Sequence, residues 1–341
     1  MEINGDLCHE LLIKNRKRKL AFNLDNDYIK WKVEVRKKFI ELVGIENIKE
    51  NACPIKVEIE EEVDLDGYKR IRFVFESEVG SFVPCYLLVP SGEVKKRPVA
   101  ITLQGHSTGF HNSVGIAKFE GDEAYIERGN FAVQAVKQGF VALAIEQRGM
   151  GERKTNVNKL DPCGYHSIMA MELGRTVIGE RIWDVSRAID ALSCFDKYCD
   201  LDKILITGNS GGGTLSFYAT CLDERIKLAV PSCGFCSFES SIMAMGHCAC
   251  NFIPNILKYF EMGDLTCLVA DRPLAIVTGS KDVWFPLDGV EKSFQTVKAI
   301  YEKEDALDKC RLVITDMGHW WCKDVIWKTI NEEVNKLGWE V

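Results

Sequence analysis

The stretch ILITGNSGGG, residues 204–213, decides the fold of this chain, because an apolar run leads directly into a serine flanked by glycines. The run Ile204–Thr207 predicts a buried strand, and Thr214–Cys221 predicts a helix. The residues between match G-x-S-x-G around Ser210, which is typical of a nucleophilic serine on a sharp strand-to-helix turn. A glycine-rich turn without chemistry is the alternative; a phosphate-binding loop is disfavoured because the Gly-Lys-Ser/Thr ending is missing.

A serine hydroxyl becomes an effective nucleophile only when a base accepts its proton. Of the six histidines, His319 is the one that follows the last predicted strand, and the order serine, acid, histidine is typical of this kind of site. Asp282 follows the strand Leu274–Thr278 and is the predicted acid that orients His319. Asp316 and Asp288 are rivals, but the Asp282 loop leaves the carboxyl end of a strand, where sites gather in such sheets.

The oxyanion that forms during acyl transfer requires two hydrogen-bond donors. The backbone N–H of Gly211, directly after the serine, is predicted to be one of them. The second is expected from the loop after the strand Val99–Leu103. There the backbone N–H of His106 is the first choice and Ser107 the second.

Short apolar runs alternate with segments long enough for helices over most of the chain. This alternation predicts a mostly parallel sheet with helices on both faces, and together with the serine turn it predicts the α/β-hydrolase fold. The predicted strands are Val99–Leu103, Val141–Ile145, Ile204–Thr207, Leu228–Val230, Leu274–Thr278 and Leu312–Thr315. The predicted helices in this region are Arg181–Phe195, Thr214–Cys221 and Asp324–Leu337.

Residues 1–50 are expected to form an N-terminal helical extension to a hydrolase domain of residues 51–341. In the extension, Asp27 is a predicted helix cap and Gly44 a predicted helix end. Alternating apolar residues on both sides of Asp66-Gly67 predict an antiparallel hairpin that opens the sheet. Longer connections predict lid-like insertions that roof a site; they are residues 104–130, 147–176 and 233–266.

Several blocks of sequence resemble the bacterial acetyl xylan esterase-like hydrolases, relatives of the dienelactone hydrolase branch. The blocks are LQGH (103–106), QRGMG (147–151), GERIWD (179–184), GNSGGG (208–213), HCACNFIP (247–254), RPL (272–274), Asp282 and His319. The resemblance runs from about residue 99 to the end of the chain. It implies hydrolysis of carboxylic esters, often acetyl groups on sugars. Family members often carry His-Gly where this chain has Gln104-Gly105.

Five residues near these motifs are expected to line the substrate site. They are Ser107, Arg148, His247, Trp284 and Trp320. An arginine there could meet an anionic substrate, and tryptophans could form an acyl or sugar platform. The alternatives are that Arg148 ties loops together through carboxylates and that the tryptophans only pack. The nearby Glu180, Arg181 and Asp184 are expected to form an ion-pair network.

Fourteen cysteines are scattered without a disulfide framework, so reduced buried thiols are expected. The pair Cys233 and Cys236, together with His247, Cys248 and Cys250, leaves a zinc site as the alternative. Ordinary thiols are favoured, because the resemblance offers a packed insertion there without metal. No cofactor is expected.

The formal net charge of −7 disfavours general nucleic-acid binding, which requires a cationic surface. No segment is long and apolar enough for a bilayer, and the N-terminus lacks the order of a secretory signal. We therefore expect a cytoplasmic protein without nucleic-acid or membrane partners. The basic cluster Lys14–Lys19 is expected to be a solvated helix face or an oligomer contact, which leaves a homo-oligomer open.

The expected function is hydrolysis of carboxylic esters through Ser210, His319 and Asp282, with a small acetylated sugar or oligosaccharide as substrate. A peptidase or a lactone hydrolase could use the same three residues, and fold alone does not decide among them. An alternative of another class is a non-catalytic receptor or scaffold on a hydrolase fold. Such proteins usually lack one member of the triad, and all three are present here.

Overall fold

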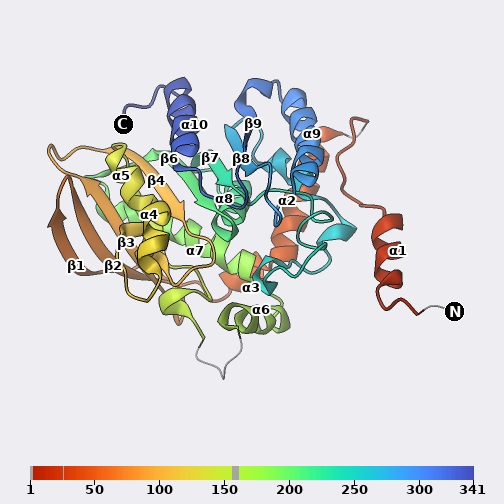
Figure 1. Cartoon of the computed structure of the whole chain (residues 1–341), viewed down its shortest axis with the longest axis horizontal. Coiled ribbons are helices and arrows are strands. Elements are labelled where there is room, and N and C mark those ends of the chain that lie inside the picture. The colour runs from red at the N-terminus through yellow and green to blue at the C-terminus, as the bar shows by residue number, and fades with distance from the viewer. Residues whose placement is uncertain (1–2, 26, 156–160) are drawn as a thin grey trace.

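A nine-stranded sheet forms the centre of the computed structural model, which describes residues 3–25, 27–155 and 161–341 (Figure 1). Its strand order is β1-β2-β3-β5-β4-β6-β7-β8-β9. The bounds are β1 Val57–Leu65, β2 Tyr68–Glu78, β3 Ser81–Pro90, β4 Arg97–Leu103, β5 Val141–Ile145, β6 Cys199–Asn209, β7 Ile226–Ser232, β8 Leu274–Gly279 and β9 Cys310–Thr315. Each predicted strand is present.

The sheet changes direction once, and this change matches the predicted antiparallel start. Strands β1, β2 and β3 pair antiparallel in sequence, and β3 then pairs antiparallel with β5. From β5 onward every pairing is parallel. The carboxyl ends of β4, β6 and β8 therefore point the same way, and the loops after them can meet at one edge.

Helices cover both faces of the sheet. Residues of α2 (Tyr28–Val43), α7 (Val177–Ala191), α8 (Gly211–Leu222) and α9 (Leu287–Lys303) belong to the larger hydrophobic cluster on one face. Residues of α5 (Phe131–Lys137) and α10 (Lys323–Lys336) belong to the cluster on the other face. The remaining α-helices are α1 Leu7–Asn15, α3 Ile45–Lys49, α4 Asp122–Gly129 and α6 Pro162–Glu172.

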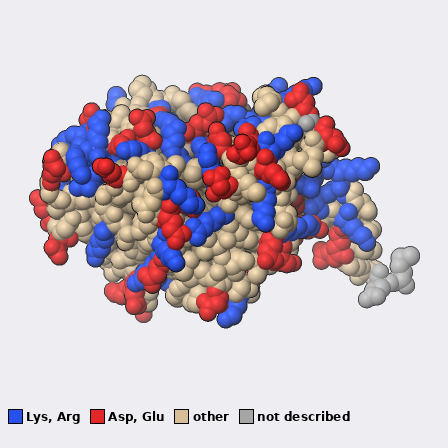
Figure 2. Space-filling model, turned by 90° about the horizontal axis from the view of Figure 1, so that it is seen from above, with Lys and Arg blue, Asp and Glu red and all other residues tan. Residues whose placement is uncertain are grey.

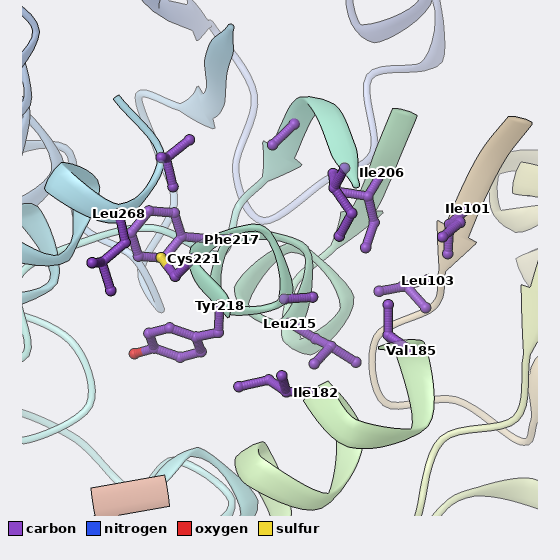
Figure 3. Close-up of a cluster of buried hydrophobic side chains, with 14 of the residues drawn as sticks. Ile101, Leu103, Ile182, Val185, Ile206, Leu215, Phe217, Tyr218, Cys221 and Leu268 are labelled. Atoms are coloured by element: carbon purple, nitrogen blue, oxygen red, sulfur yellow. The ribbon is translucent and has the colours of Figure 1, made fainter. Parts of the chain in front are cut away.

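Helix α8, which starts directly after Ser210, is buried nearly all round. Figure 3 shows Leu215, Phe217 and Tyr218 of this helix among side chains from α7 and from strands β4 and β6. Phe217 also meets Phe235 edge to face at 5.0 Å between ring centroids. A helix that is apolar on every side is fixed by the core around it, so the serine sits on a rigid support.

The N-terminal segment contributes to the same core. Asp27 caps α2 by accepting a hydrogen bond from the backbone N–H of Lys30, and Gly44 ends the helix with φ of 77°. Both predictions for this helix are confirmed. Its buried residues recur at helical spacing and belong to the cluster that contains α7 and α8; they are Trp31, Val35, Phe39 and Val43.

The three predicted insertions carry short helices instead of strands. Residues 104–130 hold α4 and the 3-10 helix η1 (Phe110–Val114), and the described part of residues 147–176 holds α6 and η2 (Gly151–Arg153). Residues 233–266 hold η4 (Ala249–Asn251), η5 (Ile256–Lys258) and most of η6 (Met262–Leu268). Two further 3-10 turns are η3 (Leu192–Phe195) and η7 (Leu307–Lys309).

The surface has no single dominant charge in the view of Figure 2, where basic and acidic side chains are interspersed over the visible face. Among the described residues, no helix combines the length and the apolar character that crossing a membrane requires.

Candidate active site

Ser210 lies in a strained backbone conformation between β6 and α8. Its φ of 58° and ψ of −125° are unusual for a residue with a side chain. Two backbone hydrogen bonds fix this turn: Ser210 N–H donates to the Ser232 carbonyl at 3.0 Å, and Thr214 N–H donates to the Ser210 carbonyl at 2.9 Å. Such strain costs about 1–3 kcal/mol and clusters at functional positions.

Two glycines allow other backbone segments to approach the serine closely. A side chain at Gly212 would collide with the Leu103 carbonyl at the end of β4. At Gly105 an added Cβ would lie 2.9 Å from both the Asn209 carbonyl and the Ser210 Cβ. The loop after β4 therefore rests directly against the serine, which a larger residue at either position would prevent.

His319 and Asp282 form a hydrogen-bonded pair behind the serine turn. His319 Nδ1 lies 2.8 Å from Asp282 Oδ2, and the other carboxylate oxygen accepts the backbone N–H groups of Trp284 and Phe285. Burial raises the pKa of the Asp282 carboxyl, but the bond to His319 and these N–H donors outweigh it and hold the pKa below its usual range. Neither rival, Asp316 or Asp288, forms an ion pair with His319 in the described structure.

A cavity of about 380 Å³ brings the predicted catalytic residues together. Ser210, Gly211, His106 and His319 all line it. Asp282 is 4% exposed and lies behind His319, outside the lining. The remaining lining residues are Gly105, Tyr125, Arg128, Gly129, Phe131, Asn209, Gly246, His247, Cys248, Asn251, Trp284, Phe285 and Trp321.

Gly211 and His106, the residues that carry the two predicted oxyanion donors, line the same cavity. Gly211 is the first residue of α8, so its backbone N–H belongs to the unpaired donors at a helix start. His106 follows Gly105, and the position of an added Cβ on Gly211 lies 3.7 Å from His106 Nδ1. The backbone of residues 105–106 and the start of α8 thus lie beside each other next to Ser210.

A buried glutamate supports the loop that carries His106. Glu146, which follows β5, accepts hydrogen bonds from the Gln104 side chain at 3.1 Å and from the backbone N–H of Phe110 and Glu152. Burial raises the pKa of its carboxyl to about 7, although the N–H donors lower it. Gln147 adds a second support by donating to the Gln104 carbonyl at 2.5 Å.

Of the five residues expected to line the substrate site, some line the cavity and others lie outside it. His247 and Trp284 do line the cavity. Ser107, Arg148 and Trp320 do not line it. The Ser107 hydroxyl turns back onto the Gly109 carbonyl, and Trp320 lies outside the cavity.

Arg148 links separate segments of the chain through carboxylates, as the alternative interpretation of this residue predicts. It is 5% exposed, and its guanidinium pairs with Asp184 at 2.9 Å, Glu78 at 2.7 Å and Glu180 at 3.4 Å. The ion-pair network expected around residues 180–184 is therefore present for Glu180 and Asp184. It excludes Arg181, which forms no ion pair with any carboxylate of the described residues.

Several cavity residues were not anticipated from the sequence. Tyr125 and Arg128 project from α4 at a spacing of three residues, which places them on one face of a helix. The guanidinium of Arg128 lies 3.8 Å from the ring centroid of Trp320, so Trp320 contacts the wall from outside. Their spacing on one face of the helix is the signal by which these two could have been found, whereas Phe131 and Asn251 carry no such signal.

The five residues of the zinc alternative do not form one site. Cys236 donates to the Pro286 carbonyl, and His247 contacts the Trp284 carbonyl. Cys233 instead lies beside Asp282 and His319, with the potential ligand atoms of all three within 4.8 Å of one another. Its thiol donates to the Trp320 carbonyl.

The other two cysteines of that alternative meet different partners. Cys248 and Cys250 approach His106 and Cys163, and these four also have their potential ligand atoms within 4.8 Å of one another. The sequence alone does not predict that Cys163 joins this group, because more than eighty residues separate it from the Cys248-Ala-Cys250 pair.

Comparisons with known proteins agree on the architecture. YtaP of Bacillus subtilis (strain 168), which is named as a candidate hydrolase, is 25% identical over 285 residues, which is 82% of this chain and 86% of YtaP. The crystal structure of a candidate acetyl xylan esterase from Bacteroides fragilis has a TM-score of 0.79 at 15% identity, covering 97% of this chain and 95% of that one.

A glucuronoyl esterase from Solibacter usitatus has a TM-score of 0.65 at 14% identity, covering 94% of this chain and 97% of that one. At these identities the two solved structures show that the fold is shared. The model of the Abhydrolase family matches residues 5–313. With this match over most of its length and the sheet described above, the chain belongs to the Abhydrolase family and has the α/β-hydrolase fold.

Proposed function

We propose that this protein is a serine hydrolase that cleaves small carboxylic esters. The observation that carries the proposal is one cavity that joins a strained serine to a histidine held by a buried carboxylate. Ser210 and His319 line that cavity, and Asp282 bonds to His319 at 2.8 Å. A serine, a histidine and an aspartate in this relation are the parts of an acyl-transfer site.

In the proposed reaction, the Ser210 hydroxyl attacks the ester carbonyl while His319 Nε2 accepts its proton. Asp282 keeps the proton of His319 on Nδ1 and stabilises the charged imidazole. The N–H groups of Gly211 and His106 bind the oxyanion. His319 then protonates the leaving alcohol, and water repeats the sequence on the acyl-enzyme to release the acid.

For the substrate we propose an acetyl ester of a small sugar or oligosaccharide. The cavity volume of about 380 Å³ lies near the lower end of the range for ligand pockets. Aromatic side chains of Tyr125, Phe131 and Trp284 line it, and such rings pack well on sugar faces. The structural similarity to a candidate acetyl xylan esterase supports the same class.

We also propose that the protein works in the cytoplasm. All fourteen cysteines are free thiols, and Cys163, Cys248 and Cys250 stay unpaired although their sulfur atoms lie within 4.8 Å of one another. Oxidising compartments favour disulfides, so a chain with this many free thiols fits a reducing compartment.

The test is hydrolysis of p-nitrophenyl acetate by the Ser210→Ala variant. We expect a loss of at least about 10⁴-fold in kcat/KM with the circular dichroism spectrum unchanged, because the variant lacks the hydroxyl that would form the acyl-enzyme. Asp282→Asn should lose activity strongly, whereas the matched control Asp316→Asn should keep it. Full activity of Ser210→Ala would refute the assignment.

Two further measurements separate the alternatives. A preference for peptide anilides or lactones over short acyl esters would favour a peptidase or a lactone hydrolase with the same three residues. A fluorophosphonate probe that leaves Ser210 unlabelled in the folded protein would favour a non-catalytic receptor.

A further inference from the structure

Four potential metal ligands meet at the rim of the cavity, and they come from all three insertions. His106 lies in residues 104–130, Cys163 in residues 147–176, and Cys248 and Cys250 in residues 233–266. The three Sγ atoms and one imidazole nitrogen all lie within 4.8 Å of one another. Cys163 and Cys250 are buried, while His106 and Cys248 reach the cavity.

The spacing of these atoms is close to that of a tetrahedral zinc site. Bonds of about 2.3 Å to sulfur and about 2.0 Å to nitrogen place neighbouring ligand atoms roughly 3.5–3.8 Å apart. The His106 Nε2 to Cys250 Sγ distance is already 3.4 Å. The fold therefore brings the four donors together from distant parts of the sequence. Only small shifts of these side chains are needed to reach the tetrahedral spacing.

A buried positive charge beside the cluster is an independent sign that negative charge belongs there. Arg181 is 2% exposed, and its guanidinium donates to the Arg148 carbonyl and, at 3.2 Å, to Cys163 Sγ. No carboxylate of the described residues pairs with it, whereas the neighbouring Arg148 has three. A buried guanidinium without an anionic partner is costly, so thiolates at this place would stabilise it.

We propose that His106, Cys163, Cys248 and Cys250 bind one Zn²⁺ ion. Three thiolates and one imidazole are a preferred zinc donor set, and four protein ligands make a closed, structural site. On binding, the three thiols release their protons to water. Three thiolates with Zn²⁺ carry one net negative charge, which the guanidinium of Arg181 neutralises.

The site goes beyond the proposed esterase function and has a separate role. It ties the three insertions to one another at the cavity rim, and through His106 it holds the loop whose backbone lies against Ser210. The ion takes no part in bond cleavage. The competing outcome for the same sulfur atoms is a disulfide between two of the cysteines, which excludes a three-thiolate site.

The test measures zinc directly. The full-length protein is expressed with zinc in the medium, purified without chelators and measured by mass spectrometry for metals. We expect about one zinc per chain in the wild type and in Cys236→Ser, a buried cysteine of the same insertion outside the cluster. We expect zinc to fall below about a tenth of that value in Cys163→Ser and in Cys250→Ser.

A second measurement covers the case in which these variants fold poorly. Wild-type protein stripped of zinc should bind Co²⁺ with the strong visible absorption of a tetrahedral site and a sulfur-to-cobalt charge-transfer band. The proposal is overturned if the wild type binds neither metal, or if folded Cys163→Ser keeps its zinc. Peptide mapping without reduction that finds Cys163 linked to Cys248 or Cys250 in the wild type also overturns it.

Discussion

At the scale of single residues, Glu146 supports the candidate active site without entering it. Its carboxylate accepts hydrogen bonds from Gln104 and Phe110, which lie on either side of His106 in the loop after β4. Burial nevertheless raises the pKa of the carboxyl from 4.5 to about 7. The folded protein thus holds a proton on Glu146 at pH values where the unfolded chain has released it.

This pKa shift predicts how Glu146→Gln changes stability with pH. Below about pH 4.5 both the folded and the unfolded protein hold the proton of Glu146, and the fold keeps its full stability. As the pH rises to about 7, the unfolded chain releases this proton first, so the wild type loses stability, because the charged form is disfavoured in the fold. The free energy of unfolding of Glu146→Gln, relative to wild type, should therefore rise by up to about 3 kcal/mol between about pH 5 and about pH 8. Urea unfolding at both pH values measures this difference.

The exposed Glu123→Gln is the matched control and should show no such change between the two pH values. A constant difference between Glu146→Gln and wild type at both pH values would mean that Glu146 titrates normally in the folded protein.

Single residues also show what local sequence can and cannot select. The choice of Ser210, Asp282 and His319 depended on local motif and chain order, and the structure brings these three together. Arg148 and Cys163 could not be assigned this way. Arg148 follows a strand just as a substrate contact would, and only tertiary packing shows that carboxylates from β2 and α7 surround it.

At the scale of elements, α2 is the least expected part of the core. Phe39 of α2 is fully buried and contacts Tyr218 of α8 at 5.4 Å between ring centroids. Because α8 begins at the serine turn, the N-terminal segment supports the helix under the candidate active site. The capping residues and apolar stripe predicted α2 itself, but no local pattern could show which surface it covers.

Shortening the side chain of Phe39 tests whether α2 is part of the core. Phe39→Ala removes a buried ring and leaves a cavity between α2 and α8, which should cost about 3–5 kcal/mol of unfolding free energy. Val33→Ala on the exposed side of the same helix should cost less than about 0.5 kcal/mol. Guanidinium unfolding compares the two variants. Equal effects would mean that α2 is an appendage and not part of the core.

Strands were predicted more accurately than the helices of the insertions, for a physical reason. Strands β4 to β8 are buried along most of their length and therefore read as continuous apolar runs. Helices α4 and α6 are short and mix exposed, partly exposed and buried residues, so no continuous run of one kind marks them in the sequence. Helix α4 supplies Tyr125 and Arg128 to the cavity wall, which is why the detailed lining was not predictable.

At the scale of the whole molecule, the sheet has an open edge at β1. Strand β1 pairs only with β2, and its residues are mostly exposed. Its outer positions are acidic; they are Glu58, Glu60, Glu61 and Glu62. Like charges along an edge strand oppose pairing with a second sheet, although Glu60, Glu61 and Glu62 are partly neutralised by basic residues of β2.

Neutralising that edge should change the state of association. A variant with all four β1 glutamates replaced by glutamine should form dimers or larger species at concentrations where the wild type does not. Light scattering coupled to size-exclusion chromatography measures the mass. The control carries four substitutions of the same type on exposed helix and loop positions and keeps the same net charge; these are Glu34, Glu50, Glu291 and Glu302. Identical masses for both variants would show that edge charge is not what limits association.

The meeting of three insertions at one rim has a consequence for any attempt to retarget the enzyme. Segments that are distant in sequence share side-chain contacts here, since His106, Cys163 and Cys250 lie within reach of one another. Grafting one loop from a homologue would leave the other two without their partner. To change the selectivity, all three insertions should therefore be exchanged together. Libraries that vary one insertion at a time should yield mainly poorly folded proteins.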